Sequence, residues 1–194
     1  MNKNALKSRL LPALLVLATT VLLSACGGYT TVDLGGSVTG VTRAGLVLAN
    51  NGKTVTIPVD AITYKFPEKI DIGSQYNVSI QAQPSALTCA LTNANGTASG
   101  QPIANVNVIC TTNTYTLGGN VNGLTTTGLT LTNGSDTLTI ASGQANFVFA
   151  GRVADGTVYG VAILTQPAGQ TCSVQNGTAV MGAANVTNVV ENCV

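Results

Sequence analysis

The chain is one segment written twice, and this duplication limits what it can fold into. Sliding the 194-residue sequence against itself gives a match at a spacing of 83 residues with no net gap. The shared positions include Leu34-Gly35-Gly36-x-Val38-x-Gly40 with Leu117-Gly118-Gly119-x-Val121-x-Gly123, Gln83-Pro84 with Gln166-Pro167, and Cys110 with Cys193. We therefore predict two copies of one domain, over residues 29–112 and 113–194.

The shared positions have the period of β-strands. Tyr76, Val78 and Ile80 alternate with polar residues, and Tyr159, Val161 and Ile163 stand at the matching places. Alternation of this kind is typical of a strand with one buried face. Helical spacing is nowhere sustained. We expect an all-β protein.

Asn-Gly pairs separate the expected strands. They occur at Asn51-Gly52, Asn95-Gly96, Asn133-Gly134 and Asn176-Gly177, and both residues tolerate the positive φ of tight hairpins. Many short strands in about 80 residues favour a small antiparallel β-sandwich of immunoglobulin-like architecture in each copy. The immunoglobulin pattern of two cysteines around a tryptophan is missing, so the strand topology stays open.

The first 25 residues have the composition of a signal peptide. Lys3, Lys7 and Arg9 precede an apolar run over residues 10–23, which is short for a membrane-spanning helix and contains Pro12. The run ends in Leu23-Ser24-Ala25-Cys26, which resembles a bacterial lipobox. The resemblance implies cleavage before Cys26, lipidation of Cys26, and a short lipidated linker over residues 26–28. An ordinary signal peptide with a chance cysteine is the alternative.

Cleavage changes the charge of the chain. The full sequence has eight Lys and Arg and seven Asp and Glu, but three of the cations lie in the leader, so the mature net charge is −2. A chain with so few cations is not expected to bind nucleic acid. Anchoring at Cys26 would place it in the bacterial envelope, and Gly27 after the cysteine points by the same resemblance to the outer membrane.

The other four cysteines form two pairs, Cys89 with Cys110 and Cys172 with Cys193, each 21 positions apart. Four cysteines allow three connectivities, and a duplicated domain is most simply crosslinked within each copy. Disulfides persist in the oxidising compartment that an exported chain reaches. A four-thiolate metal site would need a Cys-x-x-Cys spacing that the sequence lacks.

The repeated unit also resembles a known kind of module. Its Gly-Leu-x-Leu, Gly-x-x-Tyr-x-Val and Gln-Pro motifs, with the late cysteine pair, are similar to a β-sandwich repeat found in tandem in exported proteobacterial lipoproteins. The resemblance covers almost all of the mature chain. It implies a lipoprotein with two β-sandwich domains, and no activity is attached to the repeat itself.

Candidate catalytic residues are few. The sequence has no histidine, which excludes Ser-His-Asp and Cys-His catalysis and His-ligated metal sites. The densest charge cluster is Lys65-Phe66-Pro67-Glu68-Lys69-Ile70-Asp71, and an acid/base pair or a cation site would use Glu68 and Asp71, with Asp60 nearby in sequence. The alternative is a solvated loop, and the second copy does not repeat these acids. We predict no cofactor and no metal.

Three further residues bear on the core or the surface. Glu191 stands where the first copy has Val108, on the inward face of its strand by simple alternation, so a bulge or an exposed strand end is expected there. Tyr29 and Tyr64 are candidates for surface contacts.

Taken together, the sequence predicts a non-catalytic envelope lipoprotein that acts as a spacer or adhesion-like interaction module. Its partners would be the membrane, through Cys26, and an unidentified envelope or surface protein or glycan. The alternatives are a carbohydrate-binding module or hydrolase that uses Asp60, Glu68 and Asp71, and a remnant of a longer multi-domain lipoprotein.

Overall fold

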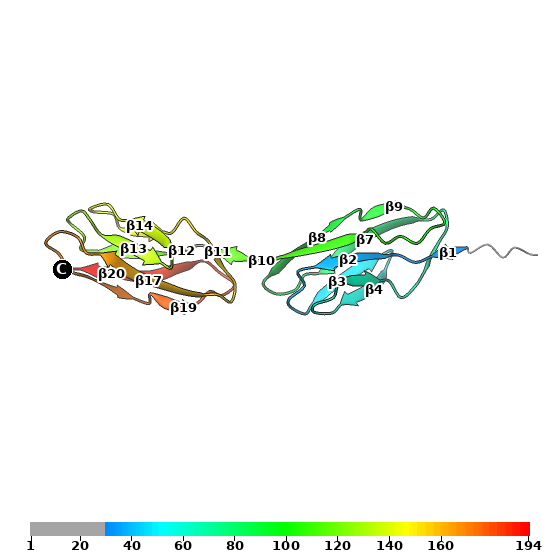
Figure 1. Cartoon of the computed structure of the whole chain (residues 1–194), viewed down its shortest axis with the longest axis horizontal. Coiled ribbons are helices and arrows are strands. Elements are labelled where there is room, and N and C mark those ends of the chain that lie inside the picture. The colour runs from blue at the N-terminus through cyan, green and yellow to red at the C-terminus, as the bar shows by residue number, and fades with distance from the viewer. Residues whose placement is uncertain (1–29) are drawn as a thin grey trace, which may run out of the picture.

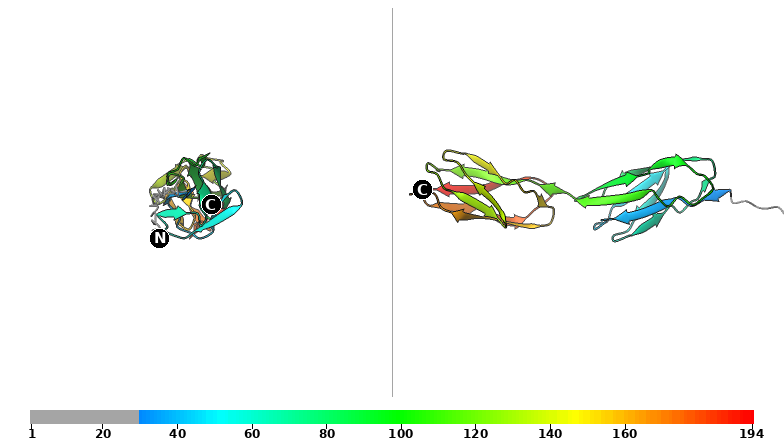
Figure 2. Two further views of the ribbon diagram at one scale, coloured as in Figure 1. Left: turned by 90° about the vertical axis from the view of Figure 1, so that its right-hand side faces the viewer. Right: turned by 45° about the horizontal axis from the view of Figure 1, so that its top comes forward.

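The structure is a computed structural model that describes residues 30–194, and these form two all-β units placed end to end (Figures 1 and 2). The first unit contains β1 (Thr31–Val32), β2 (Gly35–Thr39), β3 (Leu46–Asn50), β4 (Lys53–Ile57), β5 (Thr63–Lys65), β6 (Ile70–Asp71), β7 (Gln75–Ala82), β8 (Leu87–Thr92), β9 (Asn95–Thr97) and β10 (Asn107–Thr112). The second contains β11 (Thr114–Tyr115), β12 (Leu117–Asn122), β13 (Thr130–Asn133), β14 (Asp136–Thr139), β15 (Asn146–Val148), β16 (Val153–Ala154), β17 (Val158–Thr165), β18 (Cys172–Gln175), β19 (Thr178–Val180) and β20 (Val186–Cys193). The predicted duplication of an all-β unit is confirmed.

Each unit has the same three sheets. In the first unit their orders are β5-β2-β10-β8, β4-β3-β7-β9 and β1-β6, and in the second β15-β12-β20-β18, β14-β13-β17-β19 and β11-β16. The prediction of an antiparallel sandwich is wrong for one strand pair in each unit, because β2 pairs with β10, and β12 with β20, in parallel. The first and last long strands of a unit therefore run side by side in the same direction.

Each unit has its own hydrophobic core, drawn from both four-stranded sheets. In the first unit Leu46 and Leu48 of β3 and Val108 of β10 are fully buried in one cluster. Leu129, Leu131 and Val189 stand at or near the matching places in the second cluster. Tyr76 and Tyr159 are buried as well, at 8% and 4% exposure, so the alternation in β7 and β17 identified the inward faces correctly.

The glycines of the repeated Leu-Gly-Gly motif allow close contact with the next strand. A Cβ atom at Gly36 would lie 1.9 Å from the carbonyl oxygen of Val106, and one at Gly119 would lie 1.9 Å from that of Val189. Real Cβ atoms do not approach so closely. Only glycine fits at these two positions, and this explains why both copies carry it.

Three of the four Asn-Gly pairs lie at turns. Asn51 and Gly52 have φ values of 48° and 82° in the β3–β4 hairpin. In the second unit, Gly134 and Asn176 lie at turns and have φ values of 62° and 56°. The prediction of a turn at Asn95-Gly96 is wrong, because both residues lie in β9. There the turn falls at Asn93, with φ 54°.

A disulfide crosslinks each unit, Cys89 to Cys110 and Cys172 to Cys193. The two cysteines of each pair lie directly opposite each other on adjacent antiparallel strands, β8 with β10 and β18 with β20. The predicted pairing within each copy is confirmed. Disulfides of this kind indicate an oxidising compartment outside the cytoplasm.

Candidate functional site

The charge cluster of the first unit forms exposed ion pairs. Glu68 lies 3.0 Å from the Nζ of Lys53, and Asp33 accepts from Lys65 at 3.2 Å and lies 3.8 Å from the Nζ of Lys69. Pairs in water contribute little to stability, since solvent screens the attraction and two long side chains lose freedom. The cluster is therefore a solvated surface with charges of both signs.

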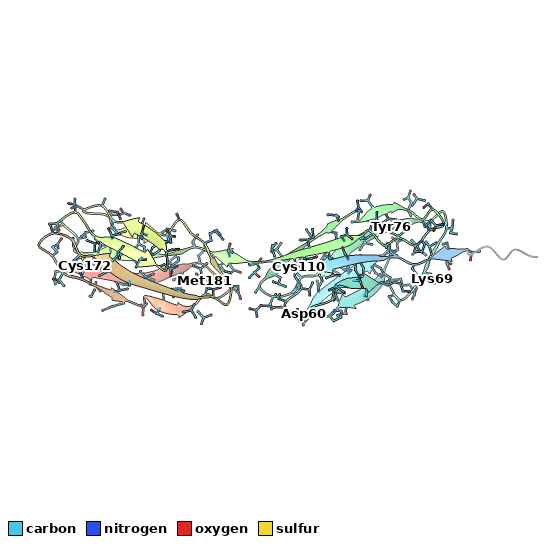
Figure 3. The ribbon with its side chains drawn as sticks, viewed as in Figure 1. Asp60, Lys69, Tyr76, Cys110, Cys172 and Met181 are labelled. Atoms are coloured by element: carbon cyan, nitrogen blue, oxygen red, sulfur yellow. A yellow bond between two sulfur atoms is a disulfide. The ribbon has the colours of Figure 1, made fainter. Side chains whose placement is uncertain are left out.

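The three acids singled out from the sequence do not meet in one place. Glu68 and Asp71 line the same shallow hollow of about 280 Å³, together with Lys53 and Lys69. Asp60 does not line it. Figure 3 places Asp60 near the junction of the units and Lys69 at the far end of the first unit. Among residues 30–194, no group of three or more His, Cys, Asp or Glu side chains could hold a metal ion.

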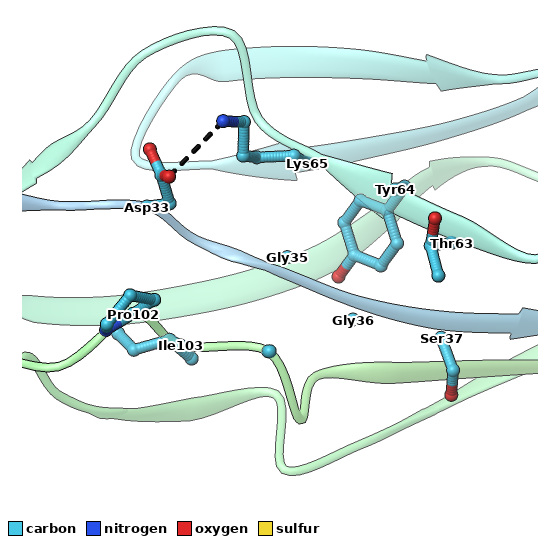
Figure 4. Close-up of a pocket in the computed structure, with 10 residues that line it drawn as sticks. Asp33, Gly35, Gly36, Ser37, Thr63, Tyr64, Lys65, Pro102 and Ile103 are labelled. Carbon is cyan, nitrogen blue, oxygen red and sulfur yellow. Dashed lines mark hydrogen bonds and ion pairs between the residues drawn. The ribbon is translucent and has the colours of Figure 1, made fainter.

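A second hollow, of about 310 Å³, lies against β2 and β5 and is lined by Asp33, Gly35, Gly36 and Tyr64, among others. Figure 4 shows the Asp33–Lys65 ion pair at its rim and the Tyr64 ring beside Gly36. Tyr64 is 9% exposed, so its expected surface position is wrong. Its hydroxyl has no hydrogen-bond partner, and burial raises the pKa of the phenol to about 12.

Tyr64 behaves as a core residue. Its ring meets Phe66 edge to face with centroids 6.0 Å apart, and in the second unit Phe147 and Phe149 form the same contact at 5.9 Å. The second unit therefore builds the same packing without a hydroxyl. A phenol that stays protonated and buried offers no acid or base to a ligand.

Glu191 lies inside the core of the second unit. Its side chain is fully buried two residues before the end of β20, opposite Val121 of β12 and Val174 of β18. The expectation of an exposed strand end is wrong. The register of β12 and β20 does shift, but between Leu117 and Gly119, and this irregularity leaves Glu191 buried.

The Glu191 carboxyl has no partner for either oxygen. The other charged side chains of the second unit are engaged elsewhere: Asp136 accepts from the Gly151 amide, Arg152 donates to Thr114, and Asp155 lies 3.4 Å from Arg43. Burial raises the pKa of Glu191 to about 7, because the charged form is poorly solvated there. With the side chain at 0% exposure, the carboxyl is closed off from a ligand at the surface.

The junction of the two units is the most specific arrangement of polar groups that we find. Only Asn113 separates β10 from β11. Its amide donates to the carbonyl of Ala86 in the first unit, and its carbonyl accepts from the amide of Asp155 in the second. Its side-chain oxygen accepts from the hydroxyl of Thr88 at 2.6 Å. Asn113 is therefore hydrogen-bonded to both units.

Side chains reinforce this junction. Arg43, in the loop after β2, lies 3.4 Å from the carboxylate of Asp155, in the loop after β16, across the boundary of the units. Asp155 has only 12% of its side chain exposed, so this pair is better shielded from water than those of the charge cluster. Arg152 donates to the backbone and hydroxyl oxygens of Thr114.

No motif in the sequence points to these junction residues. The only available signal was a break in the repeat, since the matching positions of Arg43 and Asp155 hold Thr126 and Ile72. The two residues lie 112 positions apart, so no local pattern joins them. Cys26, the predicted lipidation site, and Tyr29 lie outside the described residues.

No family model matches the chain, and no curated protein matches it either. Within residues 30–194 there is no helix long and apolar enough to cross a membrane.

Proposed function

We propose that this protein is a lipid-anchored envelope protein whose two units form a non-catalytic rod, acting as a spacer that also presents an interaction surface. The observation that carries the proposal is the course of the chain. The first strand lies at one end of the elongated molecule, the C-terminus lies at the other, and a single residue joins the units (Figure 1).

The junction supports a rigid rod rather than two domains that move independently on a flexible linker. A flexible linker would let the units diffuse independently. Here Asn113 is hydrogen-bonded to both units and the Arg43–Asp155 pair spans the boundary. We further infer that each unit belongs to the immunoglobulin-like class of β-sandwiches, because two four-stranded sheets share one core in each.

Cys26 is the proposed site of the lipid anchor. Lipidation there would fix the β1 end of the rod to the membrane and direct the C-terminal end away from it. Palmitate labelling in the native host tests this step, with Cys26→Ala as the variant and Ser24→Ala as a neighbouring control. We expect the Cys26→Ala protein to lose both the label and its membrane retention. Unchanged labelling would overturn the anchoring claim.

A carbohydrate-binding role for the first unit is the second candidate. It is favoured by one observation, that Glu68 and Asp71 line a common hollow with Lys53. A glycan array followed by titration calorimetry tests it, with Glu68→Gln and Asp71→Asn as variants and Asp60→Asn as the control outside the hollow. Binding that survives both variants, or no binding at all, would contradict this candidate.

A further inference from the structure

The outer face of β17 is unusual for a protein surface. Its outward residues are Val158, Gly160 and Ala162, followed by Leu164 where the register with β13 shifts, and all four are exposed to solvent. Val158 and Leu164 are exposed by 66% and 60%. The strand therefore presents a row of apolar and small residues to water, without a polar side chain at any of these four places.

The first unit provides the comparison. Strand β7 has Gln75, Asn77, Ser79 and Gln81 at the matching outward positions. The inward residues are the same in both strands, tyrosine, valine and isoleucine in that order. The change from polar to apolar is therefore confined to the surface of the second unit, and the packing of its core does not require it.

The neighbouring strands extend this face. Val180 of β19 pairs with Val158 and is 60% exposed, where β9 has Thr97 opposite Gln75. On the other side the outward residues of β13 and β14 are threonines, paired as Thr132 with Thr137 and as Thr130 with Thr139.

The face carries no charge. Of the charged residues in the second unit, Glu191 is buried in the core and Asp155 contacts Arg43 at the junction. Asp136 points to the Gly151 amide. Arg152 lines a hollow at one end of the face, next to Val158, but donates its hydrogen bonds to Thr114. Exposed apolar surface of this kind marks an interaction site.

We propose that this face, the outer surface of the β14-β13-β17-β19 sheet, binds the same face of a second copy of the chain. A two-fold interface brings identical patches together, so a charged patch would repel itself, whereas this neutral one does not. A charged partner would find no counter-charge here. Glycan recognition commonly uses exposed aromatic rings, and the face has none.

The dimensions of the face fit a weak dimer. Gly160 and Ala162 at its centre let two sheets approach to the roughly 10 Å spacing of packed sheets. Beside the eight residues of β17, the strands β13, β14 and β19 have four, four and three. At about 4.8 Å between strands and roughly 3.3 Å per residue, the face covers roughly 300 Å² per copy, or about 600 Å² for two copies. That total lies below the range of about 1,200 to 2,000 Å² that is usual for stable complexes. We therefore expect a concentration-dependent equilibrium between monomer and dimer.

Sedimentation equilibrium of the full chain tests the proposal, with Cys26→Ser present to keep the exported protein free of lipid. Val158→Lys with Leu164→Lys should weaken the dimer at least about tenfold, since the two copies would then repel each other across the interface. Gln75→Lys with Gln81→Lys adds the same two positive charges to the matching face of the first unit and should leave the dimer unchanged. All four positions are exposed, and circular dichroism checks that each variant is folded.

A crosslinking measurement gives an independent result. Ala162 lies near the centre of the face, so Ala162→Cys should form a disulfide-linked dimer under mild oxidation, whereas the matching Ser79→Cys should not. A chain that stays monomeric up to millimolar concentration would overturn the proposal. So would a dimer that the paired lysines in β17 leave as stable as before, since it would use another surface.

Discussion

Glu191 of β20 lies directly opposite Val174 of β18, where the first unit pairs Val108 with Leu91. In the first unit the larger side chain of the pair is Leu91 on β8, whereas in the second unit it is Glu191 on β20. A leucine has become a valine where a valine has become a glutamate, so the glutamate gains space from its partner. The core of the second unit thus accommodates the size of Glu191, but nothing compensates its polarity.

Replacement of Glu191 by valine should stabilise the second unit. The change removes a buried carboxyl without a partner, and a rise in pKa from 4.5 to about 7 corresponds to roughly 3 kcal/mol of unfavourable burial above neutral pH. Part of the gain is lost to the cavity left beside Val174, so Glu191→Val with Val174→Leu should gain more than Glu191→Val alone. Chemical denaturation at pH 8 measures both. The reverse change in the first unit, Val108→Glu, should destabilise it.

The stability of the second unit should fall with rising pH. The folded carboxyl of Glu191 has its pKa raised above the unfolded value, so its penalty is absent below about pH 4.5, grows between pH 4.5 and 7, and is complete above pH 7. Glu191→Gln, which does not titrate, should lack this part of the pH dependence. Denaturation midpoints from pH 4 to 8 test the difference. An equal slope in both proteins would show that Glu191 is not the titrating group.

Tyr64→Phe should leave the first unit as stable as before or more stable by about 1 kcal/mol. The hydroxyl makes no hydrogen bond, and the second unit has Phe147 at the matching place. The control is Phe147→Tyr, which should destabilise the second unit by a similar amount. Thermal denaturation of the two variants measures this. A clear loss of stability in Tyr64→Phe would mean that the hydroxyl has a partner.

Gly36→Ala should destabilise the first unit by about 3 kcal/mol or more, because the new methyl group would collide with the Val106 carbonyl. Gly119→Ala should do the same in the second unit. Gly182→Ala is the control, since no atom lies within 4 Å of a Cβ placed there. Protease resistance and unfolding curves distinguish the three variants, and equal tolerance of all three would contradict the close strand contact.

Local sequence patterns predicted the strands and the disulfides well, but not how distant segments meet. Alternation identified the inward side of β7 and β17 correctly. It could not show that β2 lies parallel to β10, because strand adjacency depends on contacts between the two ends of a unit. At Asn95-Gly96 the local preference for a turn lost to tertiary packing, since the Tyr76 ring covers Gly96 across β7 and β9.

The residues of the candidate site were likewise predicted only in part from the sequence. The sequence pointed to Glu68 and Asp71, which do share a hollow, and to Asp60, which does not line it. It gave Glu191 the correct inward side but the wrong exposure, because a charged residue in the middle of a core is rare unless it is paired. Arg43 and Asp155 could be recognised only after the two units were placed end to end.

The rigidity of the junction at Asn113 can be measured directly. Double electron–electron resonance measures the distance between spin labels placed on the two units. We choose Thr92 on β8 and Gln175 on β18, which are matched exposed positions. Noncanonical amino acids carry the labels, so that the disulfides stay intact. Arg43→Ala should leave the distance distribution narrow, because the backbone hydrogen bonds of Asn113 remain, whereas a flexible Gly-Ser insertion after Asn113 should broaden it.

For the unmodified junction, we predict one narrow distance distribution that does not change between low and high salt, since the backbone hydrogen bonds of Asn113 hold the units even when the ion pair is screened. A distribution as broad as that of the Gly-Ser insertion variant would contradict the rod.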